Sequence, residues 1–376
     1  RKQVANGDHQ CEISTEVDTR FRSIPTLTAE LKGNKQPDKF VMFSGHIDSW
    51  HYGVMDNGTA NAVMMEVARV LSQHQDKLDR TLRLAFWSGH SHGRYAGSAF
   101  YCDAHWEELT EDCILHVNID SVGGKNATVL TEGNCMKETT DLAKDAIGAL
   151  TGQVFEGPRF GRAGDQSFWG TGTPSVFMGL SEQEPAKGPA AEAFGQLFGG
   201  GRSGGFGWWW HTTEDTLDKI DPDNLERDCK IYLNVVYRSL TDAIIPVNQL
   251  AAVEDIETGL NDWQKKAGKH FDLSVALERI GQLKEKIVQF QREINHLDVN
   301  NEEKVELVNE TSMALSRLLV PLNYVKDSIY HHDLALGQPP IPKLAKIDQL
   351  VSTDENDKEY QFILTALRRE RNEVNY

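Results

Sequence analysis

The sequence predicts an α/β fold, in which helices flank a mostly parallel sheet, followed by a helical C-terminal domain. Four apolar runs typical of buried strands alternate with helical segments, at residues 41–44, 82–87, 114–119 and 175–178. This alternation is typical of a parallel sheet covered by helices. After about Ile245 glycines become rare and apolar residues recur at spacings of three, four and seven, which predicts long amphipathic helices. We therefore expect one domain over residues 1–246 and a helical domain over residues 247–376.

The apolar faces place the expected helices. Residues 60–71 carry Val63, Val67 and Leu71 on one face and follow a turn at residues 56–59. Because strand, loop and helix come in that order, the loop is expected at the carboxyl edge of the sheet, where open α/β folds place their sites. In the C-terminal domain the pattern predicts helices over residues 273–297, 305–325 and 359–371, with a Pro-rich break at 338–342. A Gly- and Ala-rich stretch, 188–207, predicts a flexible loop leading into three consecutive tryptophans, 208–210.

Composition excludes several classes of partner. A formal net charge of −17 over 376 residues repels nucleic acid and anionic membrane surfaces, and it leaves small molecules or peptides as the expected ligands. No apolar run is long enough to span a bilayer and no signal peptide precedes the first domain, so we expect a cytoplasmic protein, although the chain opens at Arg1 without a methionine. The five scattered cysteines lack a CxxC spacing, so we expect buried thiols rather than disulfides or a thiolate zinc site.

Residues suited to bind a metal lie at the ends of the predicted strands. His46 and Asp48 follow the first strand, Asp56 lies in the next loop, Asp120 follows the third strand, and His211 follows the tryptophans. Two imidazoles and two carboxylates are the ligand types that zinc and similar cations prefer. Asp56 is placed to serve two ions, with His46 and Asp120 on one and His211 on the other. Asp48 is expected to accept the second ring N–H of His46 and fix its tautomer.

Six segments in order, GHIDSW, DNGT, FWSG followed by GRYAGSAFY, HVNIDSVGG, AGDQSFWGTGTPS and HTTEDT, resemble the zinc aminopeptidase family. That family contains bacterial leucyl aminopeptidases, aminopeptidase Y, glutamate carboxypeptidase II and the transferrin receptor. The resemblance covers roughly residues 25–245 and implies that the positions of His46, Asp56, Asp120 and His211 bind a pair of zinc ions, with Asp56 bridging. It also implies that Asp165 lies in an acidic loop near the substrate pocket.

The sequence departs from this family at its catalytic pair. Where the family has two consecutive glutamates, one a general base and one a zinc ligand, this chain has His90 and Ser91, followed by His92. His90 or His92 is suited to complete the ligand set, since neutral imidazole binds zinc, iron, copper and nickel. His90 is equally suited to act as a general base near neutral pH. Where larger members have an oxyanion-binding tyrosine, this chain has Trp210, whose indole N–H can donate a hydrogen bond.

We therefore expect a metal-dependent hydrolase of amide or peptide bonds that holds one or two divalent ions, with zinc as the first choice. His90 and Asp48 are the candidate catalytic residues. His46, Asp56, Asp120, His211 and His92 are the candidate ligands, and Asp165, Trp210 and Ser91 are the candidate substrate contacts. Two alternatives remain open: a non-catalytic scaffold like the transferrin receptor, and a mononuclear metal enzyme with other chemistry. The apolar stripes after residue 250 predict a homodimer.

Overall fold

A computed structural model describes residues 12–130, 133–162, 164–184 and 204–376. Its central sheet has five strands in the order β1-β3-β2-β4-β6, and the last four named are mutually parallel while β1 runs antiparallel to β3. The mostly parallel sheet predicted from the sequence is confirmed. The strands are β1 Leu27–Leu31, β2 Gln36–His46, β3 Arg80–Trp87, β4 Cys113–Asn118 and β6 Ser175–Val176.

Two features of the strands differ from the sequence prediction. The fourth apolar run forms a strand only over Ser175–Val176, so it is shorter than expected. The edge strand β1 was not predicted, because four of its five residues are exposed and no apolar run marks it. A small second sheet pairs β5, Ala127–Val129, with β7, Glu182–Gln183.

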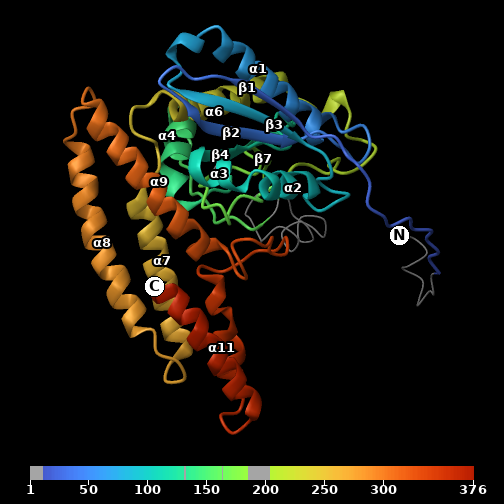
Figure 1. The fold of residues 1–376 in the computed structure, drawn as a ribbon. Helices are drawn as coiled ribbons and strands as arrows, with labels where there is room; N and C mark the ends of the chain where they lie inside the picture. The colour runs from blue at the N-terminus through green and yellow to red at the C-terminus, as the bar shows by residue number, and fades with distance from the viewer. Residues whose placement is uncertain (1–11, 131–132, 163, 185–203) are drawn as a thin grey trace.

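Helices cover both faces of the sheet (Figure 1). Successive residues of β2 point to opposite faces, as a strand requires. Val41 and Phe43 pack in the core with α1, α4 and α6, while Phe40 and Met42 pack with α2 and α3. The helices are α1 Ala60–Ser72, α2 Ala96–Ala104, α3 Trp106–Asp112, α4 Thr140–Thr151 and α6 Pro222–Thr241. Short helical turns are η2 Val54–Thr59, η3 Gln75–Lys77, η4 Lys137–Thr139, η5 Leu217–Lys219 and η6 Pro342–Lys346.

The C-terminal residues form a helical layer beside the sheet (Figure 1). Helices occur where the apolar spacing predicted them, as α8, α9 and α11, and two more, α7 and α10, were not predicted. The bounds are α7 Gln249–Ala267, α8 Ser274–Asn295, α9 Glu302–Tyr324, α10 Ile347–Ser352 and α11 Lys358–Asn375. These helices bury a core of their own, built from residues such as Val253, Ile280 and Leu367. None of the described helices is both long and apolar enough to cross a membrane.

The end of α9 joins the helical layer to the sheet layer. Val320 and Tyr324 belong to the same core as the sheet. The partly buried guanidinium of Arg317 donates hydrogen bonds to the carbonyl groups of Gly172, Leu109 and Cys113. Residues on both sides of the predicted boundary at 246 therefore contribute to the sheet core, and the two cores meet along α9.

Two sequence predictions fall largely or wholly outside the described residues. Most of the glycine-rich stretch 188–207 lies there, and so does Cys11. The other four cysteines are free thiols, with Cys102, Cys113 and Cys135 buried and Cys229 partly buried. This agrees with the expectation of thiols rather than disulfides for the part of the chain that the structure describes.

Candidate metal centre

The candidate site lies at the carboxyl ends of three neighbouring strands. His46 is the last residue of β2, His90 follows β3 by three residues, and Asp120 follows β4 by two. Asp56 comes from η2, between β2 and α1. The sequence predicted this edge of the sheet, because parallel strands bring their carboxyl ends together.

Asp56 lies between two histidines. Its Oδ1 is 2.9 Å from Nε2 of His46 and its Oδ2 is 3.0 Å from Nε2 of His211. Both Nε2 atoms are buried, yet neither has a hydrogen-bond partner among the described residues, because the short contacts lack hydrogen-bond geometry. A buried polar nitrogen without a partner is costly unless another group occupies its lone pair. The donor set therefore fits a divalent ion on either side of Asp56.

Neighbouring residues hold Asp56 in place. Gly53, at φ 61°, opens the loop, and a Cβ there would lie 2.6 Å from the carbonyl oxygen of Asp56. The carboxylate of Asp215 accepts the backbone N–H groups of Met55 and Asp56. The side chain of Asn57 accepts the N–H of Ser121 at 3.0 Å, which ties this loop to the one that carries Asp120.

His90 contacts three groups of the site. Its Nδ1 lies 2.7 Å from Oδ2 of the buried Asp165. Its Nε2 lies 3.9 Å from Oδ2 of Asp120. Its ring stacks on that of His46, with centroids 3.8 Å apart and planes 12° from parallel. The imidazole of His90 thus lies beside the candidate ligands.

Asp48 is placed differently from the prediction. The ring Nδ1 of His46 lies 2.7 Å from the main-chain oxygen of Asp48 and 3.6 Å from its carboxylate. The hydrogen bond that fixes the tautomer is therefore made by the carbonyl group. The Asp48 carboxylate instead accepts the backbone N–H of His90 at 3.1 Å, so this residue orients both histidines.

The charges of the site favour a cation. Burial disfavours the charged imidazole of His46, but the carboxylates of Asp120, Asp48 and Asp56 outweigh it and hold the pKa of His46 well above its usual range. Burial likewise disfavours ionised Asp56, but His211 and His46 hold the pKa of Asp56 well below its usual range. The pKa of Asp165 is lowered in the same way, since its contact with His90 outweighs its burial.

A comparison with sequence models of known protein families shows which family this chain belongs to. The family model described as peptidase family M28 matches residues 26–236. The chain belongs to peptidase family M28. This confirms the family resemblance inferred from the sequence motifs.

Individual M28 relatives match over shorter stretches. A probable glutamate carboxypeptidase of Zea mays is 28% identical over 106 residues, which are 27% of this chain and 15% of that protein. An aminopeptidase of Mus musculus is 27% identical over 128 residues, 32% of this chain and 17% of that one. The alignments thus span less than a fifth of these two relatives. The structural alignment with a solved zinc aminopeptidase from Bacillus subtilis covers 58% of this chain and 50% of that chain, with 20% sequence identity and a TM-score of 0.47.

The remaining predicted residues of this M28 chain lie around the site in different ways. The exposed His92 packs against Trp50, with ring centroids 4.9 Å apart, and the structure does not bring it into the ligand group. Ser91 is partly exposed. The rings of Trp210 and His211 stack with centroids 3.4 Å apart. The indole N–H of Trp210 donates to Ser121 Oγ at 3.0 Å, so its hydrogen bond is made within the protein.

Sequence reasoning missed the residues that orient the ligands. Asp215, Ser121 and Ser98 were not singled out. Ser121 donates to Oδ1 of Asp120 at 2.8 Å, and Ser98 donates to Oδ1 of Asp165 at 2.8 Å. A weak signal existed for Asp215 and Ser121, since each lies within four residues of a predicted ligand. Nothing in the sequence connected Ser98 to Asp165.

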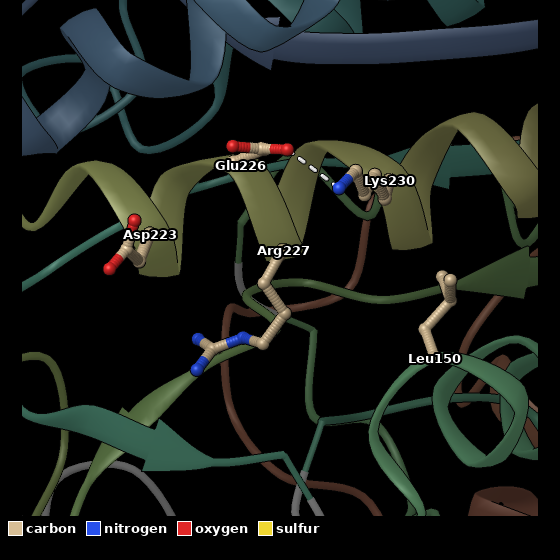
Figure 2. Close-up of a pocket in the computed structure, with 5 residues that line it drawn as sticks. All are labelled: Leu150, Asp223, Glu226, Arg227 and Lys230. Atoms are coloured by element: carbon tan, nitrogen blue, oxygen red, sulfur yellow. Dashed lines mark ion pairs between the residues drawn. The ribbon is translucent and has the colours of Figure 1, made fainter.

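A separate hollow of about 330 Å³ lies along α6 and the end of α4 (Figure 2). It is lined by Leu150, Asp223, Glu226, Arg227 and Lys230. Three of its charged side chains form ion pairs: Glu226 lies 2.6 Å from Lys230, and Arg227 lies 2.8 Å from Asp228. We assign no chemistry to this hollow.

Proposed function

We propose that this M28 chain is a metal-dependent hydrolase of amide or peptide bonds. The observation that carries the proposal is the pair of buried Nε2 atoms, on His46 and His211, that face Asp56 from opposite sides without hydrogen-bond partners. Membership of the peptidase family supports the reaction class. Glutamate carboxypeptidases and aminopeptidases among the relatives support peptides as substrates.

Divalent metal, with zinc as the first choice, would be held among His46, Asp56, Asp120 and His211, where His46 and His211 face different oxygens of Asp56. When bound, it would supply an activated water and polarise the carbonyl group of the substrate. The chain's own residues orient the donors: the carbonyl of Asp48 fixes the His46 ring, Ser121 fixes Asp120, and Asp215 fixes the backbone of Asp56. One or two ions are compatible with this donor set.

The substrate preference is proposed to differ from that of an ordinary aminopeptidase. At the positions where the family resemblance implies a general-base glutamate and its acidic neighbour, this chain has His90 and Ser91. Fewer carboxylates are then available to bind the free amine of a peptide N-terminus. We propose small amides or modified amino acids alongside peptides as substrates, with Trp210 and Ser91 as the residues nearest to them. Asp165, predicted as a third substrate contact, is buried and its two carboxylate oxygens face His90 and Ser98, so we assign it to holding His90.

The helical layer is proposed to form a homodimer. Leu307 and Leu318, three helical turns apart on α9, are 63% and 70% exposed. Phe362 on α11 is 66% exposed. Exposed apolar side chains repeated along a helix favour a protein partner, and a second copy of the same chain is the simplest one.

One experiment tests the proposed reaction. Metal content of the purified protein is measured by elemental analysis, together with hydrolysis of peptides with free N-termini and of small amides. We expect stoichiometric divalent metal, and Asp56→Ala should lose both metal and turnover. Asp76→Ala, which removes an exposed carboxylate from η3, should change neither. Protein that contains no metal after reconstitution with zinc would favour the scaffold, whereas bound metal without any hydrolysis would favour other metal chemistry.

A further inference from the structure

We infer that His90 is itself a metal ligand. Together with His46 and Asp120 it would form a site of two imidazoles and one carboxylate for a single transition-metal ion, with Asp165 as the positioning residue. This inference rests on the proposed function only in requiring a divalent ion at the site, and it does not depend on the reaction catalysed.

Three donor atoms converge on one position. His46, His90 and Asp120 are buried, and one ligand atom from each lies within 4.8 Å of the other two. Asp120 Oδ2 lies 3.5 Å from Nε2 of His46 and 3.9 Å from Nε2 of His90. Ligands about 2.1 Å from a tetrahedral ion are separated by roughly 3.4 Å. The observed spacings are close to that value, and 3.9 Å is too long for a direct hydrogen bond.

The tautomers of both histidines are fixed from the far side of each ring. Nδ1 of His46 faces a carbonyl oxygen and Nδ1 of His90 faces a carboxylate, and both groups only accept hydrogen bonds. In the neutral rings Nδ1 therefore carries the hydrogen, and each Nε2 directs a lone pair into the site. Metal-binding histidines are oriented in this way by carboxylates or carbonyls.

Asp165 is itself rigidly held. It is 1% exposed, and its second oxygen accepts the hydroxyl of Ser98, a residue of α2. The helix lies close to the loop of His90, since a Cβ at Gly97 would lie 2.3 Å from the carbonyl oxygen of Ser88. The orientation of His90 is thus built into the packing of α2 against the end of β3.

Asp120 offers one oxygen to the same position. Its Oδ1 is occupied by the hydroxyl of Ser121, which in turn accepts the indole N–H of Trp210. Oδ2 is the oxygen that faces both histidines. Asp56 Oδ1, 2.9 Å from Nε2 of His46, is close enough to provide a fourth ligand.

The position on the other side of Asp56 has fewer donors. His211 and Asp56 Oδ2 face it, and within the described part of the chain no second group of three ligands converges. We therefore expect one tightly bound ion rather than two. A general base at this position would need the lone pair of His90 Nε2. A ligand uses the same lone pair, so His90 cannot bind the ion and act as the base at the same time.

The test measures metal binding rather than activity. Zinc dissociation constants are obtained by chelator competition for the wild type, His90→Ala, His90→Phe and Asp165→Asn, and zinc X-ray absorption counts the imidazole ligands. His90→Phe keeps a ring beside His46 without a nitrogen donor. We expect Asp165→Asn to weaken binding by about 10-fold to 100-fold, and both His90 variants to weaken it further and lose one imidazole. His74→Ala, which removes an exposed histidine, should bind zinc like the wild type.

Wild-type affinity and an unchanged imidazole count in folded His90→Phe would overturn the inference. Thermal unfolding of the metal-free variants separates loss of a ligand from loss of the fold, and if His90→Ala does not fold, His90→Phe decides. Different results would refute the proposed hydrolase reaction and the proposed ligand role of His90. Zinc bound through His90 without hydrolysis of any amide would refute the proposed reaction alone, whereas hydrolysis with zinc that does not involve His90 would refute the ligand role alone.

Discussion

The carboxylate of Asp215 accepts the backbone N–H of Asp56, with 3.0 Å between Oδ2 and N. Its other oxygen accepts the N–H of Met55 at 2.9 Å. Asp215 therefore fixes the backbone that aims the Asp56 carboxylate at both histidines, although it faces no ligand position itself.

We predict that Asp215→Ala weakens zinc binding by about 10-fold to 100-fold, as is typical when a residue that orients a ligand is removed. Asp215→Asn, which keeps one acceptor, should weaken it less. Glu214→Ala changes the adjacent exposed carboxylate and should leave the zinc dissociation constant unchanged. Equal zinc affinities for Asp215→Ala and the wild type would show that the loop keeps its geometry without this anchor.

Glu138 should make the protein less stable as the pH rises. Burial raises the pKa of Glu138 to about 7 from an ordinary 4.5. Between these pH values Glu138 ionises in the unfolded chain but stays protonated in the folded one. The resulting loss of unfolding free energy is absent below about pH 4.5, grows above it and reaches its limit above about pH 7. Glu138→Gln should therefore increase the free energy of unfolding at pH 8 by up to about 3 kcal/mol, with little gain at pH 4.5.

Chemical denaturation at both pH values measures this gain. Glu107→Gln, on the exposed side of α3, serves as the matched control. A gain for Glu138→Gln that is the same at pH 4.5 and pH 8 would mean that packing, rather than ionisation, sets the effect.

His116 should make the fold sensitive to mild acid. Burial lowers the pKa of His116 to about 3, and its ring bridges Ser44 and Ser175 on neighbouring strands, at 2.8 and 3.2 Å. A lowered histidine pKa contributes stability that is fully present above about pH 6.5 and is lost as pH falls toward 3, because only the unfolded state takes up the proton.

From pH 7 to pH 5, His116 should therefore cost the wild type about 2 kcal/mol of unfolding free energy. His116→Gln should lack that part of the pH dependence, while being less stable at pH 7. Urea titrations in the presence of a chelator exclude the effect of metal loss. Parallel pH profiles for the two proteins would disprove a buried neutral His116.

The proposed homodimer predicts the mass of the protein in solution. At micromolar concentration, sedimentation should give twice the chain mass of 42.2 kDa. Leu307→Glu combined with Leu318→Glu should shift the protein toward the monomer, because a charged side chain is costly to bury in an apolar interface. Glu306→Gln, on the same helix, should not. A monomeric wild type would refute self-association through this layer.

The sequence predicted the sheet and the position of the site because both depend on local signals. The apolar run that ends at His46 indicates a buried strand and also where its polar end must lie. The contacts between His90 and Asp165, 75 residues apart, depend on how α2 packs against the end of β3, and no local pattern encodes that packing. Similarly, residue types alone identified Trp210 as a hydrogen-bond donor but did not show that Ser121 receives its N–H.

Edge strand β1 and helix α7 were missed for different reasons. The side chains of β1 are mostly exposed, so the strand is stabilised mainly by its hydrogen bonds to β3, which a composition pattern does not show. Helix α7 buries Ile256, Leu260 and Trp263 at helical spacing, but it directly follows the change in composition after Ile245. The first helix predicted in this region begins at residue 273, so the apolar spacing of α7 was not used.

The end of α9, where Val320 and Tyr324 enter the sheet core, has a consequence for how the molecule loses its structure. Removing the helical layer would expose the surfaces of Trp169 and Cys113 that Tyr324 and Arg317 cover. Two domains that met only through a flexible tether would melt in two steps. Here the shared helix couples the two cores, so heating the metal-free protein should produce one cooperative transition rather than two.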